Sequence, residues 1–203
     1  MARPLIDGFG RVHRDLRISV TDRCNFRCGY CMPAEGLQWL QRSELLTFEE
    51  IERVARLLVE RYGIDNIRLT GGEPTVRADL SRLVRMLADL DVDLALTTNG
   101  ATLGLAATGL ADAGLRRINV SLDSLRADRF ADLTLRDELG RVLDGIDAAL
   151  SAGLDPVKIN VVVMRDVNDD ELVDFARFGR DRGVVVRFIE FMPLDADEAW
   201  TPR

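Results

Sequence analysis

The amino-acid sequence predicts an α/β fold, an incomplete (βα)6 TIM-like barrel with a mainly parallel six-stranded sheet. Segments of strand periodicity alternate with segments of helical periodicity along the 203 residues, which is typical of parallel strands joined by right-handed helical crossovers. An open doubly wound sheet fits this alternation as well as a barrel-like sheet does. The expected strands are polar on one face, however, and strands that helices cover on both faces are usually apolar throughout. This pattern favours a curved sheet with helices outside and a hydrated or ligand-filled cavity inside.

Each element follows from a local pattern. Strands are expected at residues 15–21, 66–70, 93–99, 116–123, 156–164 and 184–191. Helical periodicity places helices at residues 47–63, 79–90, 103–113 and 139–153, and a last one from Asn168 or Asp169 to Arg182. The first helix has a start signal in the capping-box pair Thr47 and Glu50, and a stop signal in Gly63. The polar stretch 124–138 predicts one short helix and a loop.

Composition and charge set the broad class. The chain is 47% hydrophobic and 30% charged, which predicts one globular domain over residues 1–203. No apolar run approaches the roughly 20 residues that span a bilayer, and the first residues lack the apolar core of a signal peptide. We therefore expect a cytoplasmic protein with no membrane contact. The net charge of −7 argues against nucleic acid as a partner.

The polar face of the expected strands carries positive charge. Arg17, Arg68 and Lys158 each stand between two apolar residues of their strands, so all three are expected on the cavity side. Arginine forks and a lysine point charge suit a phosphate group. The alternative is that these cations are ion-pair partners of a buried acid such as Asp123 or Glu190.

All three cysteines fall in one segment, "CNFRCGYC", directly after the first expected strand. Cys24, Cys28 and Cys31 have Cx3Cx2C spacing, and three thiolates can hold three irons of a [4Fe–4S] cluster and leave the fourth open. A zinc site would require a fourth ligand, and the only histidine, His13, lies before the strand. Zinc, a redox thiol and unrelated buried cysteines remain as alternatives.

Several motifs resemble those of one known superfamily. "CNFRCGYC" is similar to the Cx3CxΦC signature of the radical S-adenosylmethionine (SAM) enzymes, with Tyr30 in the aromatic position. "GGEP" (71–74), "TTNG" (97–100) and "NVSLDS" (119–124) are similar to its further motifs. The stretches "DLRISVTDRCNFRCGYCMP", "LRRINVSLDSL" and "RFIEFMP" resemble one member family, the GTP 3',8-cyclases of molybdenum cofactor biosynthesis.

The resemblance implies two cofactors, a [4Fe–4S] cluster and SAM. By resemblance the cluster ligands are Cys24, Cys28 and Cys31. The residues that would contact SAM are Tyr30, Gly72, Glu73, Ser121 and Met192. Two of these have ordinary alternatives, because Tyr30 can be a loop aromatic and Met192 a core methionine.

The resemblance also implies a substrate, a reaction and partners. GTP would be bound by Arg17, Arg68, Thr97 and Lys158, with Arg187 as a weaker candidate. The enzyme would be a lyase in which a 5'-deoxyadenosyl radical takes the ribose C3' hydrogen, and the product would be 3',8-cyclo-7,8-dihydro-GTP. A reductant protein of unknown identity is expected, and a homodimer is open.

The resemblance is incomplete at the C-terminal side. The family holds a second cluster on three cysteines there, whereas no cysteine follows Cys31 in this sequence. The expectation is therefore a single radical-SAM core domain without that segment, with full cyclase activity in question. Two alternatives are a radical SAM maturase acting on a peptide and a non-catalytic domain that binds SAM and a cluster.

Overall fold

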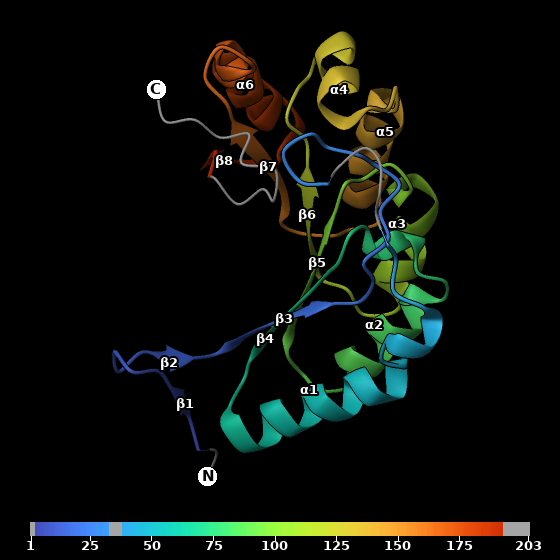
Figure 1. Ribbon diagram of the computed structural model, residues 1–203, viewed down its shortest axis with the longest axis vertical. Coiled ribbons are helices and arrows are strands. Elements are labelled where there is room, and N and C mark those ends of the chain that lie inside the picture. The colour runs from blue at the N-terminus through green and yellow to red at the C-terminus, as the bar shows by residue number, and fades with distance from the viewer. Residues whose placement is uncertain (1–2, 33–37, 193–203) are drawn as a thin grey trace.

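The main sheet of the protein has six strands, all parallel, in the order in which they follow along the chain. The computed structural model describes residues 3–32 and 38–192, and Figure 1 shows how their elements are arranged. The strands are β3 (Asp15–Ser19), β4 (Asn66–Thr70), β5 (Asp93–Thr98), β6 (Arg117–Ser121), β7 (Val157–Val163) and β8 (Val185–Glu190). The number, order and direction of the strands confirm the prediction.

Helices connect consecutive strands, as right-handed crossovers require. The α-helices are α1 (Phe48–Tyr62), α2 (Leu80–Ala88), α3 (Leu103–Asp112), α4 (Ala127–Thr134), α5 (Leu139–Ser151) and α6 (Leu172–Arg182). Short 3-10 helices are η1 (Arg42–Glu44), η2 (Pro74–Val76) and η3 (Asp169–Glu171). Within the described ranges, none of the helices has the length and apolar character needed to cross a membrane.

The predicted signals of the first helix are confirmed. The Thr47 side chain accepts a hydrogen bond from the Glu50 backbone N–H, and the Glu50 carboxylate accepts one from the Thr47 N–H. Gly63 ends α1 with a φ of 74°, a left-handed conformation that favours glycine. Local sequence chemistry therefore sets both ends of α1.

One local expectation is only partly right, and one element was missed. Asn168 stands at the N-cap position of η3, which continues directly into α6 at Leu172, but its side chain makes no capping hydrogen bond. The buried Asn168 side chain instead donates to the carbonyls of Asp123 and Val162, and so joins the ends of β6 and β7. The sequence analysis also missed a hairpin of β1 (Leu5–Ile6) and β2 (Val12–His13), whose strands are too short to show alternation.

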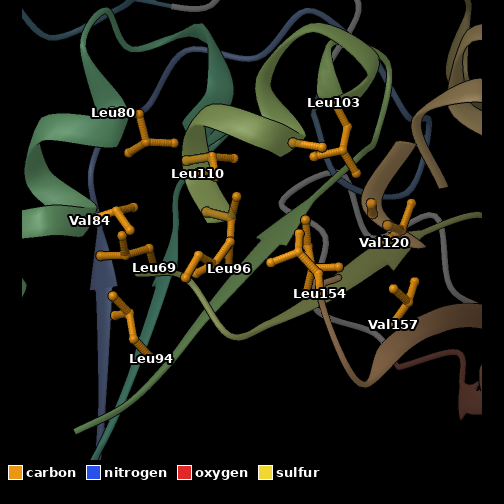
Figure 2. Close-up of a cluster of buried hydrophobic side chains, with 14 of the residues drawn as sticks. Leu69, Leu80, Val84, Leu94, Leu96, Leu103, Leu110, Val120, Leu154 and Val157 are labelled. Carbon is orange, nitrogen blue, oxygen red and sulfur yellow. The ribbon is translucent and has the colours of Figure 1, made fainter. Parts of the chain in front are cut away.

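The apolar core lies between the sheet and the helices on its outer side, and Figure 2 shows part of it. Fully buried side chains from the strands meet fully or nearly buried side chains of α2 and α3. They include Leu69, Leu94, Leu96 and Val120 from the strands and Leu80, Val84, Leu103 and Leu110 from the helices. Burial of apolar surface stabilises by about 25 cal/mol per Å². This burial fixes which way each strand faces, so the alternate residues must point to the inner face of the sheet.

Candidate active site

The loop with the three cysteines follows the carboxyl end of β3, where functional residues gather in βα folds. Cys24 and Cys28 are half-buried, Cys31 is exposed, and none is in a disulfide. Burial raises the pKa of all three thiols, that of Cys28 to about 12 with added effects of Asp123 and the other two cysteines. In the described residues, no three His, Cys, Asp or Glu side chains are close enough to hold a metal ion.

The predicted "GGEP" motif packs directly on the start of this loop. The Gly72 N–H donates to the Thr21 carbonyl and the Glu73 N–H to the Arg23 carbonyl, both at 2.7 Å. A Cβ atom on Gly72 would lie 2.4 Å from the Arg23 carbonyl oxygen, and one on Gly71 would lie 2.5 Å from that of Thr21. The two glycines are therefore required for the contact between the motif and the cysteine loop.

The carboxylate of Glu73 joins two of the predicted motifs. It is almost fully buried, at 1% exposure. One oxygen accepts from the Thr75 N–H and from the hydroxyls of Thr75 and Thr98, and the other accepts from the Asn99 N–H at 2.6 Å. Glu73 thus connects "GGEP" to "TTNG", a structural role that the sequence analysis missed. Its contact with SAM stays a prediction.

The "TTNG" motif in turn contacts the cysteine loop. The Asn99 amide donates to the Asn25 side-chain carbonyl at 2.7 Å, and its nitrogen lies 3.9 Å from the Cys24 sulfur. Two of the predicted motifs therefore surround the cysteine loop, and they come from the carboxyl ends of β4 and β5.

The structure shows the surroundings of Tyr30 and Met192, for which the sequence allowed two interpretations each. The Tyr30 hydroxyl donates to Asp123, and its ring meets the edge of Phe191 with 6.3 Å between centroids. Tyr30 therefore joins the cysteine loop to β6 and β8. Met192 is 51% exposed, so the alternative of a core methionine is wrong. Ser121, at the end of β6, is half-buried.

The inner face of the sheet carries five cations. Strand register places Arg17 beside Arg68, and Arg117 on the same row two strands beyond Arg68, with Ala95 between them. Lys158 lies beside Asn119, and Arg187 beside Asn160. Burial, reinforced by Arg117, Arg187 and Arg68, lowers the pKa of Lys158. Like charges disfavour the charged form, so this shift follows from the neighbouring cations as well as from burial.

Two carboxylates, Asp15 and Asp93, share this face by register, and Asp93 pairs with Arg117. Among the described residues, no carboxylate lies within ion-pair distance of Arg17, Arg68 or Lys158. Asp123, which the sequence analysis considered as a partner for these cations, accepts from Tyr30 and from the Val162 N–H instead. The ion-pair alternative therefore finds no support at these three residues.

Amide side chains hold Arg187 in place. Its guanidinium donates to the side-chain oxygen of Asn160 at 2.6 Å and to the side-chain oxygen of Asn119 at 2.8 Å. Asn119 donates in turn to the Thr97 hydroxyl at 3.3 Å. Thr97 and Arg187, both predicted to bind substrate, thus belong to one network on the inner face.

The sequence analysis did not single out Arg117. Arg117 nevertheless shares the parity of Asn119 and Ser121 along β6. The Arg117 guanidinium lies 2.7 Å from an oxygen of Asp93, which is on the same face. Extending the period-two pattern to the first residue of β6 would have found it.

Comparison with protein families defines the class of this protein. The family model described as "Radical SAM superfamily" matches residues 18–179, so the chain belongs to the radical SAM superfamily. Its cofactors are accordingly a [4Fe–4S] cluster and SAM. The donor set fits, since three thiols without a fourth protein ligand suit a cluster with one open iron.

Curated relatives narrow the comparison. A GTP 3',8-cyclase of Rhodopirellula baltica is 54% identical over 201 residues, and one of Acidothermus cellulolyticus is 56% identical over 207 residues. Each match covers 98% of this chain but only 56% and 57% of the relative. The chain therefore spans little more than half the length of these curated relatives.

Solved structures confirm the fold class. Streptococcus suis SuiB bound to S-adenosylmethionine has a TM-score of 0.76 at 17% identity, and the match covers 94% of this chain and 43% of SuiB. anSMEcpe with bound AdoMet and a peptide has a TM-score of 0.66 at 18% identity, covering 89% of this chain and 52% of that protein. At such low identity these likenesses show the fold alone.

Proposed function

We propose that this chain is the radical-SAM core of a GTP 3',8-cyclase that converts GTP to 3',8-cyclo-7,8-dihydro-GTP in molybdenum cofactor biosynthesis. The two relatives that carry this name are more than half identical over 98% of the chain. The single observation that carries the substrate is the inner face of the sheet, where five cations share one surface with the carboxylates of Asp15 and Asp93.

The chain's own residues would bind and orient the two ligands. Cys24, Cys28 and Cys31 would hold the cluster. Together with SAM the cluster would supply the radical chemistry that the removal of the C3' hydrogen of the ribose requires. Arg17, Arg68 and Lys158 would bind the triphosphate by charge-assisted hydrogen bonds. Fixing the phosphates on the sheet positions the ribose relative to the cysteine loop, and orientation of this kind lowers the barrier of a reaction between two bound ligands.

The electrostatics of the site favour an anionic substrate. Burial, with Arg68 and Arg117 nearby, lowers the pKa of Arg187, as burial and neighbouring cations lower that of Lys158. These cations raise each other's energy while they face one another without an anion. A triphosphate would remove this repulsion, so part of its binding energy comes from strain that the folded chain already contains.

A peptide substrate fits the same face less well. The structural neighbours include SuiB bound to its precursor peptide and anSMEcpe bound to a peptide, but these likenesses concern the fold. A peptide offers at most one carboxylate per acidic residue, whereas a triphosphate presents several anionic oxygens within a short length.

A reductant protein, a homodimer and a cytoplasmic location remain predictions.

Isotope transfer tests the proposed function. The anaerobically reconstituted chain is incubated with SAM, dithionite and GTP that carries deuterium at C3', and the 5'-deoxyadenosine is analysed by mass spectrometry. We expect deuterium in the 5'-deoxyadenosine, and none when the deuterium is at C2'. Unlabelled 5'-deoxyadenosine, formed equally with and without GTP, would contradict the proposal.

A further inference from the structure

We propose that Arg117 is a further substrate-binding residue, which donates hydrogen bonds to a phosphate group of the nucleotide while Asp93 holds its guanidinium in position. This inference rests on the proposed function, because it concerns the same inner face of the sheet. It adds a residue that neither the sequence motifs nor the alternation considered above had assigned to the substrate.

Arg117 belongs to a row of inward-facing residues that crosses four strands. Register places Arg17 opposite Arg68, Arg68 opposite Ala95, and Ala95 opposite Arg117. The four residues therefore form one row across β3, β4, β5 and β6, and all point to the inner face. Ala95 is the only member without a charge, and it is small and buried. Strands lie about 4.8 Å apart, so Arg68 and Arg117 are only two strand spacings apart, and their long side chains can both reach one ligand on the inner face.

The guanidinium group of Arg117 has hydrogen-bond partners for only some of its N–H donors in the described part of the chain. An arginine has five N–H donors. One terminal nitrogen of Arg117 lies 2.7 Å from Asp93 and 3.4 Å from the Asn66 side-chain oxygen. The Nε atoms of Arg117 and Arg68 are both buried without a hydrogen-bond partner among the described residues. Buried polar groups normally have a partner, so two such donors in one row point to a ligand with acceptor oxygens.

Arg117 also acts on the other cations of the inner face. Arg117 is, after burial, the largest cause of the lowered pKa of Lys158, and it also lowers the pKa of Arg187. In the strand order Arg117 on β6 stands between Arg17 and Arg68 on β3 and β4 and the pair Lys158 and Arg187 on β7 and β8. A ligand that bridges these two groups of cations would therefore lie near Arg117.

An ordinary ion pair with Asp93 is the competing explanation. The Asp93 side chain is 43% exposed and that of Arg117 is 23% exposed, and such partly exposed pairs contribute little to stability. Asp93 neutralises one charge and fixes the direction of the fork, but it leaves the Nε donor without an acceptor. A positioning role for Asp93 and a binding role for Arg117 account for both features.

Calorimetric titration of the full chain with GTP, GMP and guanosine tests the proposal. Arg117→Ala should weaken GTP binding about tenfold or more, weaken GMP binding less, and leave guanosine unchanged. Arg116→Ala is the matched control, because it removes the same charge from the exposed neighbour on the other face. Arg117→Lys, which keeps the charge but loses the fork, should recover only part of the GTP affinity.

The outcomes separate this inference from the proposed function. If Arg68→Ala weakens GTP binding while Arg117→Ala does not, the proposal for Arg117 fails and the proposed function stands. Equal losses of melting temperature in Arg117→Ala and Asp93→Asn, with GTP affinity unchanged in both, would show that the pair is structural. If the unmodified chain binds GTP no better than guanosine, the proposed function itself fails.

Discussion

The Tyr30 hydroxyl donates a hydrogen bond to Asp123 at an oxygen–oxygen distance of 2.5 Å. The other carboxylate oxygen of Asp123 accepts from the backbone N–H of Val162 at 2.8 Å. Asp123 is almost fully buried, and this burial raises its pKa. One side chain thus connects the cysteine loop to the ends of β6 and β7, and it sets where the loop lies on the sheet.

Tyr30→Phe removes this link and little else. One buried oxygen of Asp123 loses its donor, and an unsatisfied buried polar group costs about 1–3 kcal/mol. We therefore expect the free energy of unfolding in urea to fall by about that amount, and the loop to retain less iron after reconstitution. Tyr62→Phe is the control, since the Tyr62 hydroxyl has no hydrogen-bond partner in the described part of the chain. Equal stability of the two variants would show that the link is unimportant.

Glu73→Gln tests the buried junction between "GGEP" and "TTNG". Each carboxylate oxygen accepts from a backbone N–H, one from Thr75 and the other from Asn99. A glutamine must turn its NH2 group toward one of these donors, so the junction should lose about 1–3 kcal/mol of unfolding free energy. The same change at the exposed Glu49, which pairs with Arg82 on the surface, should have little effect. Urea unfolding of the two variants gives the comparison, and equal midpoints would argue against the junction.

Gly72→Ala tests the close approach of the motif to the cysteine loop. The added Cβ would lie 2.4 Å from the Arg23 carbonyl oxygen, so the backbone must move. We expect a folded chain that takes up much less iron than the unchanged protein, which should approach about four irons per chain for a [4Fe–4S] cluster. Gly29→Ala lies in the cysteine loop itself, where a Cβ meets no atom within 4 Å, and it should bind iron normally. Normal iron content in Gly72→Ala would show that the contact is dispensable.

Lys158→Met should stabilise the fold and weaken GTP binding. Burial and the cations Arg117, Arg187 and Arg68 lower the pKa of Lys158 from its usual 10.5. Between that lowered pKa and 10.5 the unfolded chain binds more protons than the folded chain, so the unfolding free energy rises with pH. The methionine removes this rise and removes the repulsion at neutral pH.

Unfolding in urea at neutral pH and near pH 10, together with GTP titration, checks this prediction. Lys158→Arg keeps the charge, so its stability should stay low at neutral pH and should lack the rise near pH 10. GTP affinity should fall about tenfold in the methionine variant. Lower stability of Lys158→Met at neutral pH would mean that Lys158 is an ion-pair partner.

Periodicity predicted the fold well because it reflects burial directly. Leu69 and Leu96 are fully buried while their neighbours Arg68 and Thr97 face inward, and this alternation is visible in the sequence. The cysteine spacing was equally plain. Interactions between distant segments were not predictable, because the partner of a buried polar group depends on tertiary packing. The link from Tyr30 to Asp123 spans 93 residues and leaves no local pattern.

The same limit applies to Asn168 and Arg117. Asn168 is a common helix-capping residue type, but here the buried carbonyls of Asp123 and Val162 compete for its side chain. Arg117 lies inside the expected strand at 116–123, and its parity indicated a face of the sheet but not its neighbours. Register across β5 and β6, which only the structure supplies, places it in the row with Arg68.

The central claim is that the inner face of the sheet binds the triphosphate, and titration of the unmodified chain with GTP, GDP, GMP and guanosine tests it most directly. We predict that affinity falls at each step as phosphates are removed, by about tenfold for each charge-assisted contact that is lost. The salt dependence of binding should fall in the same order, because screening weakens exposed charge pairs. Equal affinity for GTP and guanosine would contradict the account.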